Sequence, residues 1–506
     1  MSNKFFNLKD LSTIILEKKK EKKKIILCHG VFDLLHIGHI KHFQKAKKFG
    51  DFLVVSITVD KYVNKGNNRP LFNEDLRAEA IAALNVVDAV CLSHFPSAVN
   101  IINIVKPNFY FKGADYKDHK KDLTRKIQLE TDTVKKYGGK IIYTNEITFS
   151  STNLLNHSFG LLNEEQKKYL KAIKLKYSLD VIVQYINSLS NIKVLVLGET
   201  IIDQYIFCEA LGKSGKEPYL AMRELDTKNY LGGAAAIANN LSAFTKNVGL
   251  LSMIGQNKEY LDFIKKKINK NITTKFLYKK NSPTILKKRF LDNVSKSKIF
   301  GSYQINDQEL SLIDDYNLLH LVKKFSNKYD LIVISDYGHG FISSYISNYL
   351  RKLNKFISLN AQVNAGNIGY HTLNKYKKVD ALVINESELR HEMRNKNEAV
   401  KILAKILLKK IGIKNLVVTR GIQGAFLLND HEHFIDCPAF AEKVVDKVGA
   451  GDTMLAVISL CLKAKVPYDL SLLLGSLAGS ISVGAFANSK ILDKNYFIRI
   501  VETYLK

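Results

Sequence analysis

The stretch Ile25–His39, IILCHGVFDLLHIGH, decides the fold of the first part of the chain. An apolar run typical of a buried strand ends at Gly30, and a helix is expected to start near Gly38. Backbone N–H groups at such a strand-to-helix turn bind phosphate, and the helix N-terminus adds a positive dipole. His36 and His39 are three residues apart, so both imidazoles reach one side of the helix start. They can hydrogen-bond the phosphates of a nucleotide while pyrophosphate leaves, which predicts catalytic roles in nucleotidyl transfer.

Strand-like and helical segments alternate outward from this stretch to about residue 145, which predicts a parallel α/β sheet of Rossmann-like type. The expected strands are IILCHG, FLVVSIT, AVCLS, FYFKG and KIIYT, with helices from His39 and around 74–84 and 99–105. We assign residues 1–160 to this domain. Residues 161–190, which are polar and mostly helical, are expected to form a connector.

The stretch Asp446–Thr453, DKVGAGDT, indicates a second chemistry near the other end of the chain. Gly449 and Gly451 let the backbone turn sharply before a strongly helical segment. The N–H groups of Ala450 and Gly451 can then form an anion hole for a phosphoryl group in transfer. Asp452 can take the proton from an attacking hydroxyl, which predicts a catalytic base for phosphoryl transfer.

A larger α/β unit is expected around this motif, over residues 191–506. It opens with KVLVLGE, and its later strands are expected to include LIVISD, ALVIN, NLVVTR and AFLLN. Two segments, about 205–230 and 282–304, are poor in helical periodicity. They predict a small β lid on this unit.

The composition and the cysteine pattern argue against disordered, membrane and secreted proteins. The 506 residues are 46% hydrophobic and 25% charged, which is typical of globular domains. No run of 18 uncharged apolar residues is present, so no membrane span is expected. The N-terminus lacks the apolar region of a signal peptide. The five cysteines follow no zinc or disulfide pattern, which favours a reducing cytoplasm.

The net charge of +28 makes nucleic acid a partner to consider. The lysines are scattered, however, and the one dense block, Lys18–Lys24, lacks the interleaved aromatic residues of an RNA-binding surface. We therefore expect no nucleic-acid partner; steeply salt-dependent RNA binding would indicate one. HIGH also occurs in class I aminoacyl-tRNA synthetases, but Asn293–Ser297 matches their KMSKS loop only faintly.

Residues 25–155 resemble the cytidylyltransferase-like family, in particular the adenylyltransferase domain of bifunctional heptose-phosphate enzymes. The matching pieces are GVFDLLHIGH, Lys65-Gly66 with Arg69-Pro70, Arg77, VVDAV, KGADY (112–116) and FSST (149–152). The resemblance implies that the nucleotide phosphates contact His36, His39, Ser151 and Thr152. It implies further nucleotide contacts from Gly30, Phe32, Asp33, Gly38, Lys112, Gly113 and Asp115, and a substrate contact from Arg77.

Residues 192–506 resemble the ribokinase-like (PfkB) sugar kinases along their whole length. The pieces in order are GETIIDQY, LGGAAAIANN, ISDYGHG, INESE, a TRG loop and DKVGAGDT. The resemblance implies substrate-binding roles for Asp203, Gly232, Gly233, Asn240 and Asp336. It implies that Asn385 and Glu388 organise Mg²⁺ indirectly, that ATP or another nucleoside triphosphate is the co-substrate, and that the nucleotide contacts Thr419, Gly421, Gly449, Ala450 and Gly451.

Three departures from this pattern leave the sugar open. Ala236 stands where heptose kinases usually have Asn, and GKSGKEPYLAMRE differs from the usual Pro-rich substrate loop. Lost polar groups change which sugar hydroxyls are satisfied. The domain order is also the reverse of the common heptose enzyme, in which the kinase comes first.

Together the halves predict a bifunctional enzyme of nucleotide-activated sugar synthesis. By resemblance, the kinase phosphorylates heptose 7-phosphate at O1, and the transferase joins a sugar 1-phosphate to a nucleotide and releases pyrophosphate. The product would be ADP-heptose for lipopolysaccharide or capsule. The alternative is an active nucleotidyltransferase for another sugar or polyol phosphate, such as glycerol 3-phosphate with CTP, fused to a kinase-fold binding or scaffolding module. The nucleotide base and the anomer stay open, and the lid is a candidate homodimer surface.

Overall fold

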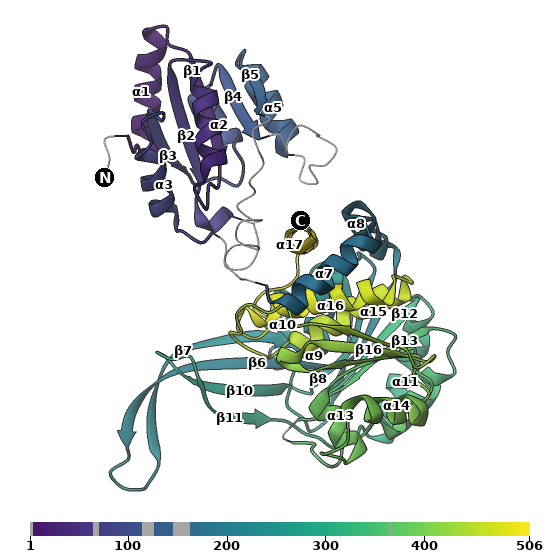
Figure 1. Ribbon diagram of the computed structural model, residues 1–506. Coiled ribbons are helices and arrows are strands. Elements are labelled where there is room, and N and C mark those ends of the chain that lie inside the picture. The colour runs from purple at the N-terminus through teal and green to yellow at the C-terminus, as the bar shows by residue number, and fades with distance from the viewer. Residues whose placement is uncertain (1–3, 64–69, 114–125, 145–161, 365, 506) are drawn as a thin grey trace. The chain divides into compact units, whose positions relative to one another are not determined.

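The computed structural model describes residues 4–63, 70–113, 126–144, 162–364 and 366–505. The chain divides into two compact units (Figure 1), of which the first holds residues 1–163 with Glu502–Tyr504 and the second holds 164–501. Helices α7 (Glu164–Lys176) and α8 (Leu179–Ser188) lie in the range expected for a connector and group with the second unit. The domain limits inferred from the sequence stay a prediction.

The first unit is built on a five-stranded parallel sheet with strand order β3-β2-β1-β4-β5. Its strands are β1 (Ile25–Gly30), β2 (Phe52–Thr58), β3 (Ala89–Ser93), β4 (Phe109–Gly113) and β5 (Lys140–Thr144). The Rossmann-like sheet expected from the sequence is therefore confirmed. Because the strand order reverses between β1 and β4, their carboxyl ends flank the crevice where sheets of this kind bind ligands.

Helices cover both faces of this sheet. The α2 (Ile37–Lys47) and α3 (Glu74–Ala82) helices pack on one face, and α1 (Leu8–Lys20), α4 (Val99–Val105) and α5 (Lys126–Lys136) pack on the other. Asn side chains start two of them: Asn7 caps α1 and Asn73 caps α3 by accepting backbone N–H bonds. The sheet is thus buried on both sides, and its polar strand ends are left for chemistry.

The second unit is built on a larger sheet that is mostly parallel. Its strands in spatial order are β9 (Ile272–Lys279), β8 (Val248–Gly255), the first part of β6 (Val194–Lys213), β12 (Leu331–Asp336), β13 (Phe356–Ala361), β14 (Ala381–Asn385), β15 (Asn415–Thr419), and the antiparallel β16 (Ala425–Asn429) and β17 (Phe434–Cys437). The β13, β8, β9 and β17 strands were not among those expected from the sequence.

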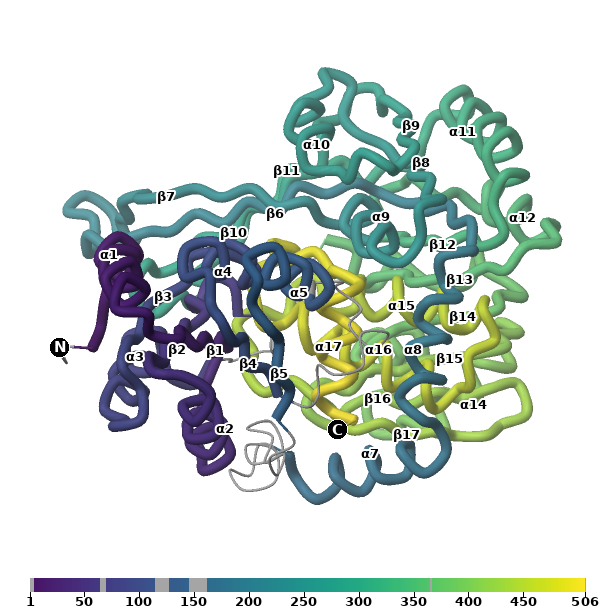
Figure 2. The backbone as a smooth tube through the Cα atoms, turned by 90° about the horizontal axis from the view of Figure 1, so that it is seen from above, coloured from purple at the N-terminus to yellow at the C-terminus, as the bar shows by residue number. Residues whose placement is uncertain are grey.

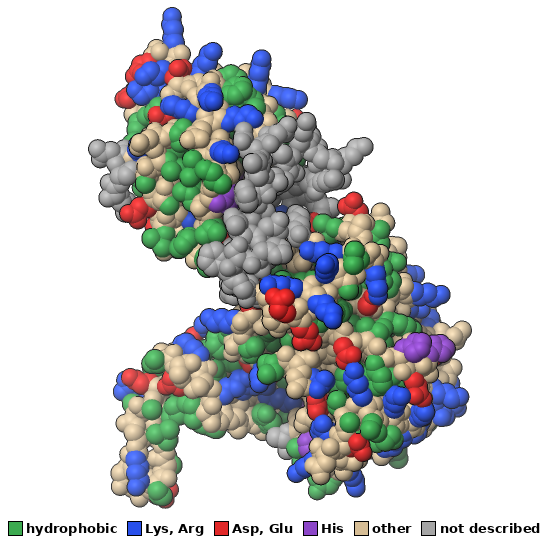
Figure 3. Space-filling view, in the orientation of Figure 1, with side chains coloured by type: hydrophobic (Ala, Val, Ile, Leu, Met, Phe, Trp, Pro, Cys, Tyr) green, Lys and Arg blue, Asp and Glu red, His purple; other side chains and the backbone are tan. Residues whose placement is uncertain are grey.

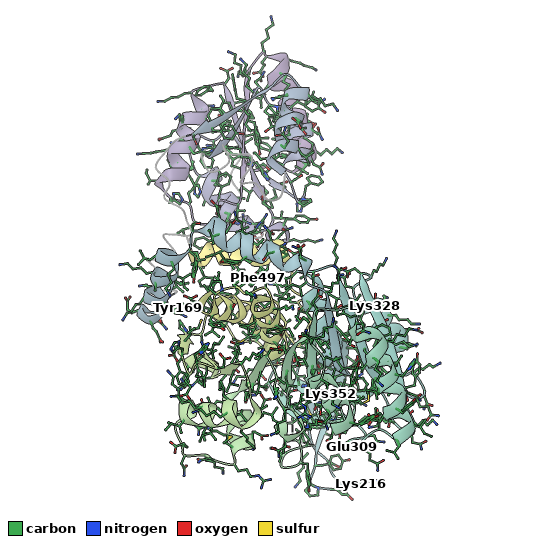
Figure 4. The ribbon with its side chains drawn as sticks, turned by 90° about the vertical axis from the view of Figure 1, so that its right-hand side faces the viewer. Tyr169, Lys216, Glu309, Lys328, Lys352 and Phe497 are labelled. Atoms are coloured by element: carbon green, nitrogen blue, oxygen red, sulfur yellow. The ribbon has the colours of Figure 1, made fainter. Side chains whose placement is uncertain are left out.

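Two layers of helices enclose this sheet (Figure 1). One layer contains α9 (Gly233–Ser242), α15 (Ala450–Lys463) and α16 (Tyr468–Val483), and the other contains α11 (Leu312–Ser326), α12 (Ser344–Arg351), α13 (Glu386–Met393) and α14 (Val400–Ile411). The α10 (Leu261–Lys267) and α17 (Lys494–Leu505) helices complete the unit. Tyr169 of α7 and Phe497 of α17 attach their helices (Figure 4): the Tyr169 hydroxyl donates to the Asp469 carbonyl at 3.1 Å, and the Phe497 and Phe244 rings lie 5.4 Å apart.

A four-stranded lid sheet extends from the large sheet and confirms the predicted β lid. The second part of β6 pairs with the antiparallel β7 (Leu220–Gly232) and the parallel β10 (Ile285–Asp292), and β10 pairs with β11 (Lys298–Gln304). Figure 2 shows β6 and β7 running out together as a long pair. Since β6 is one strand of 20 residues, it belongs to both sheets and joins them without a hinge loop.

No helix among the described residues is long and apolar enough to cross a membrane. On the face shown in Figure 3, Lys and Arg side chains are scattered among acidic and apolar ones. They form no single basic stripe on that face.

Candidate functional sites

The first candidate site lies where β1 ends and α2 begins. His36 is the N-cap of α2, and its Nδ1 accepts the Gly38 N–H at 3.0 Å. An accepting Nδ1 carries no proton, so a neutral His36 presents Nε2–H as a donor. The His39 ring stacks on the His36 ring with 3.9 Å between centroids. The two imidazoles are therefore brought together at a helix N-terminus, as the sequence predicted.

The loop before α2 is held by its own side chains. Phe32 has a left-handed backbone, with φ of 49°, and its ring meets His39 edge-on at 5.3 Å. A Cβ on Gly30 would lie 3.0 Å from the Phe32 ring, so glycine lets the ring lie close against the strand end. The buried Asp33 carboxylate accepts the Leu71 and Phe72 N–H groups at 2.5 and 3.3 Å. These residues support the histidines, and their nucleotide contacts stay a prediction.

Arg77, expected to bind substrate, is buried and directed into the protein. Its guanidinium donates to the carbonyls of Phe72 and Thr58 at 2.9 Å each and to that of Val31, and it pairs with Asp60. Each of its three nitrogens is therefore engaged by the protein. This arrangement ties the loop after β1 to the end of β2, and a substrate contact for Arg77 stays a prediction.

Lys112 lies at the end of β4, on the other side of the crevice from β1. Its ammonium is 2.9 Å from Glu130, which also accepts the Tyr110 hydroxyl at 2.9 Å. Burial raises the pKa of Glu130, but Lys112, His29 and the Tyr110 hydroxyl together outweigh it, and the net shift of the pKa is downward. Burial, with Lys112 adding to it, lowers the pKa of His29 to about 3. The sequence did not single out His29 or Glu130.

Several predicted residues of this site fall outside the described part of the chain, namely Asp115, Ser151 and Thr152. Gly113 is described, and a Cβ there would meet no atom within 4 Å. The space beside the end of β4 is thus open among the described residues.

The second candidate site lies at the N-terminus of α15. Gly449 is the N-cap with φ of 87°, and a Cβ there would lie 2.1 Å from Asn488 Oδ1, so only glycine fits. Ala450 and Gly451 form the first turn, whose N–H groups face outward along the helix dipole. Asp446, in the same loop, accepts bonds from Lys298 at 2.6 Å and from Tyr205, both of which come from the lid. The lid is therefore tied to the anion-hole loop.

Asp452 lies in this first turn with one oxygen already held. The Tyr337 hydroxyl donates to Asp452 Oδ1 at 2.7 Å. Burial raises the pKa of Asp452 to about 6, the Tyr337 bond and Lys287 oppose this, and Asp203 adds to it. A carboxylate with such a pKa is suited to accept a proton near neutral pH.

The predicted sugar-binding residues Asp203, Gly232 and Gly233 lie together beside the lid. A Cβ on Gly232 would lie 2.3 Å from Asp203 Oδ2, and one on Gly233 would lie 2.3 Å from the Glu199 carbonyl. Glycine is thus required for this approach of β7 to β6. Asp203 forms a buried ion pair with Arg289 of β10, a partner that the sequence did not indicate.

Asn240 and Asp336 are brought near the site but are occupied by protein partners. The Asn240 amide donates to Thr453 at 3.1 Å and accepts the Leu492 N–H at 3.1 Å. Asp336 is buried, accepts the Tyr376 hydroxyl at 2.6 Å and pairs with Lys375 at 2.7 Å. Their substrate contacts stay predictions, and in this structure both residues hold elements in place.

Asn385 and Glu388 form a capping box at the start of α13. Asn385 Oδ1 accepts the Glu388 N–H and Glu388 Oε2 accepts the Asn385 N–H, each at 2.8 Å. Burial raises the pKa of Glu388 to about 7. No cluster of three His, Cys, Asp or Glu side chains that could hold a metal occurs among the described residues. The indirect role of this pair in holding Mg²⁺ stays a prediction.

The nucleotide-proximal loop follows β15. Thr419 ends the strand, and Gly421 has φ of 58°, where an added Cβ would meet no atom within 4 Å. Arg420 is anchored to Glu386 at 3.2 Å, and Ile422 is 94% exposed. The loop thus presents an apolar side chain and open backbone, which suits a nucleotide base.

Two families match the chain. The pfkB family of carbohydrate kinases matches residues 191–494, and the cytidylyltransferase-like family matches residues 27–157. The chain is also similar to the solved structure of phosphofructokinase-2 from Escherichia coli in complex with potassium. The match covers 62% of this chain and 100% of that one, with a TM-score of 0.51 and 15% identity. At this identity the likeness concerns the fold alone.

Curated relatives share the name "Bifunctional protein HldE". The protein from Geobacter metallireducens is 37% identical over 168 residues, which is 32% of each chain. The protein from Haemophilus influenzae (strain PittEE) is 26% identical over 315 residues, which is 61% of this chain and 63% of that one. The matches therefore cover from about a third to less than two thirds of these relatives.

Proposed function

Because the chain belongs to the pfkB family of carbohydrate kinases and also carries a cytidylyltransferase-like domain, we propose that it is a bifunctional enzyme of nucleotide-activated sugar synthesis. The kinase half would phosphorylate heptose 7-phosphate at O1 with ATP. The transferase half would join a sugar 1-phosphate to a nucleotide and release pyrophosphate, giving an ADP-heptose-like product. One observation above all supports the proposal: in each half, the side chains expected to be catalytic lie at the N-terminus of a helix.

In the kinase reaction, Asp452 takes the proton of the O1 hydroxyl through the oxygen that Tyr337 leaves open. The O1 oxygen then bonds to the γ-phosphorus of ATP while the bond to the β,γ-bridging oxygen breaks, and ADP leaves. The N–H groups of the Gly449–Gly451 turn stabilise the phosphoryl group in transfer. Mg²⁺ would neutralise charge on the phosphates, held through water by Asn385 and Glu388.

In the transferase reaction, the sugar 1-phosphate oxygen bonds to the α-phosphorus of the nucleotide while pyrophosphate leaves. His36 donates through Nε2–H to the phosphates, because its Nδ1 is occupied by the Gly38 N–H. His39 adds a second donor beside it. No covalent intermediate is needed, since positioning and charge stabilisation suffice.

We also propose that the protein dimerises through the lid and acts in the cytoplasm. The lid carries exposed apolar side chains, among them Leu211, Leu220, Leu225 and Phe300, which a second copy could cover. All five cysteines are free, which suits a reducing compartment. Sedimentation of the wild type and of Leu220→Lys tests the dimer, which the substitution should weaken. A monomeric wild type would contradict the proposed dimer.

The test of the function is nucleotide consumption by the purified chain with Mg²⁺. ATP, CTP and GTP are each offered with heptose 7-phosphate or heptose 1-phosphate, and ADP and pyrophosphate are followed separately. The proposal expects ADP with the 7-phosphate and pyrophosphate with the 1-phosphate. Pyrophosphate alone would favour an active transferase fused to a silent kinase fold, for which Ala236 is the motivating departure. If neither ADP nor pyrophosphate formed, heptose would be ruled out as the substrate.

A further inference from the structure

One row of side chains crosses the lid sheet from edge to edge. Strand pairing aligns Tyr230 of β7 with Asp203 of β6, Asp203 with Lys287 of β10, and Lys287 with Tyr303 of β11. Residues aligned in this way point to the same face of a sheet, about 5 Å apart from strand to strand. Lys287 is therefore the direct neighbour of the carboxylate that the family pattern assigns to sugar hydroxyls.

Lys287 is a buried cation without an anion of its own. Only 6% of the residue is exposed, and in the described part of the chain its ammonium has no hydrogen bond or ion pair. It lies instead over two aromatic rings, 5.5 Å from the centre of Tyr303 and 5.7 Å from that of Tyr337. Rings hold a cation but do not neutralise it.

The nearby carboxylates are held by other donors. Asp203 pairs with Arg289, and Asp452 accepts the Tyr337 hydroxyl. Glu199, the third, accepts two backbone N–H groups at 3.0 and 3.1 Å. A buried charge is costly unless it is paired, and here an anion from outside the protein can do so.

The position of Lys287 favours the acceptor side of the reaction. Burial lowers the pKa of Lys287, and among the carboxylates that oppose this effect Asp203 contributes more than Glu199 or Asp452. Lys287 is thus nearer in electrostatic terms to the sugar-binding carboxylate than to the catalytic base. Arg289, two residues on, faces the same side but is neutralised by Asp203.

We propose that Lys287 binds the phosphate group that the acceptor sugar already carries, so that the lid strand β10 selects phosphorylated over unphosphorylated sugars. This inference rests on the proposed kinase function. It assigns to the lid a role in specificity, in addition to covering the site.

Calorimetry on the full chain without ATP tests this role. Heptose 7-phosphate and unphosphorylated heptose are titrated into the wild type, Lys287→Met and Lys288→Met. Lys288 is the matched control, because it carries the same charge on the same strand but points to the opposite face. Lys287→Met should weaken binding of the 7-phosphate roughly 10- to 100-fold, as expected for loss of a charge-assisted bond to phosphate. Lys288→Met should change it less than about threefold, and Lys287→Arg should restore part of the loss.

Four results would overturn the inference. Lys287→Met could leave 7-phosphate binding intact in calorimetry and lower only kcat in a steady-state ADP assay, which would place the lysine at the transferring phosphoryl group. Lys287→Met could weaken binding of the phosphorylated and the unphosphorylated sugar equally, or Lys288→Met could weaken 7-phosphate binding as much as Lys287→Met does. Either result would indicate a general loss of lid structure. If the wild type binds no heptose 7-phosphate, the proposed substrate fails, and the comparison is repeated with fructose 6-phosphate and fructose. Binding of neither phosphorylated sugar would overturn this inference as well.

Discussion

The two candidate sites use the same element, a helix N-terminus, but it is capped differently in each. At α2 the cap is His36, whose side chain closes the first turn and is itself expected to act on phosphate. At α15 the cap is Gly449, which has no side chain, and Asp452, the expected base, lies within the first turn. The first arrangement directs a donor outward, whereas the second leaves the N–H groups open for an anion.

This difference follows from the chemistry proposed for each site. Nucleotidyl transfer to a phosphate oxygen needs donors for the departing pyrophosphate but no base, since the attacking oxygen is already anionic. Phosphorylation of a hydroxyl needs a base as well as an anion hole, and the glycine cap leaves space for both. Variants that act on one helix start and spare the other therefore test whether the two sites work independently.

The largest expected effect comes from removing the base. Asp452→Asn should lower the kinase rate by on the order of 1,000-fold, because general base catalysis is lost, and should leave pyrophosphate release unchanged. ADP and pyrophosphate assays on the same preparation measure both. If pyrophosphate release fell equally in a folded protein, the assignment of two separate sites would be wrong.

Loss of a phosphate donor should come next. His36→Ala or His39→Ala should lower nucleotidyl transfer roughly 100-fold, as removal of one preorganised donor does elsewhere, with the kinase rate unchanged. Steady-state kinetics of both reactions provide the measurement. His42 lies in the same helix as His39, and its side chain bonds that of Thr144 in β5 at 2.9 Å. It offers a control, because His42→Ala should have a much smaller effect on nucleotidyl transfer.

A smaller effect, visible mainly in the pH profile, is expected from Tyr337→Phe. The base must be unprotonated, so kinase activity should fall as the pH drops through the Asp452 pKa of about 6. Tyr337 lowers this pKa by donating to the carboxylate, so its loss should move the acid limb of kcat upward by about one pH unit. The variant Tyr376→Phe, which loses a bond to Asp336 instead, should leave the limb in place. An unmoved limb in Tyr337→Phe would mean that Asp452 is not the titrating base.

The smallest expected effect concerns two Asn helix caps. Asn73→Ala at α3 and Asn385→Ala at α13 should each lower the free energy of unfolding of its unit by about 1 kcal/mol. Denaturant titration of each variant beside the wild type, followed by circular dichroism, measures this. Only Asn385→Ala should also raise the Mg²⁺ concentration needed for half-maximal kinase rate; an equal Mg²⁺ requirement would reduce Asn385 to a cap.

The sequence predicted the elements that carry strong local patterns. The strands of the first sheet are short apolar runs bounded by turns, so their limits were nearly right. The stretch KVLVLGE marked where β6 begins, but the strand continues to Lys213. The lid was recognised from the loss of helical period. FISLNA, the strand β13, was missed because its Ser and Asn break the apolar run, although Ser358 is buried and bonds Ser459 of α15.

Partners across the sheet were harder to foresee. Arg77 and Asp336 were expected to contact substrate, and nothing local indicates that Thr58 and Lys375 lie beside them. Lys287 was missed for the same reason, since its significance comes from its register with Asp203 and from the absence of a counter-charge among the described residues. The N-x-x-E spacing of Asn385 and Glu388, in contrast, is a capping signal that lies within four consecutive residues and can be recognised from the sequence alone.

The strand β6 has a consequence for how this protein can change over evolution. Its first residues pair with β8 in the large sheet, and its later residues pair with β7 in the lid. A lid joined by a loop can be exchanged between relatives as a separate module. A lid made from the continuation of a central strand cannot, because any insertion that shifts its register by one residue turns Asp203 to the opposite face. New sugar preferences are therefore more accessible through single side chains on β10 than through replacement of the whole lid.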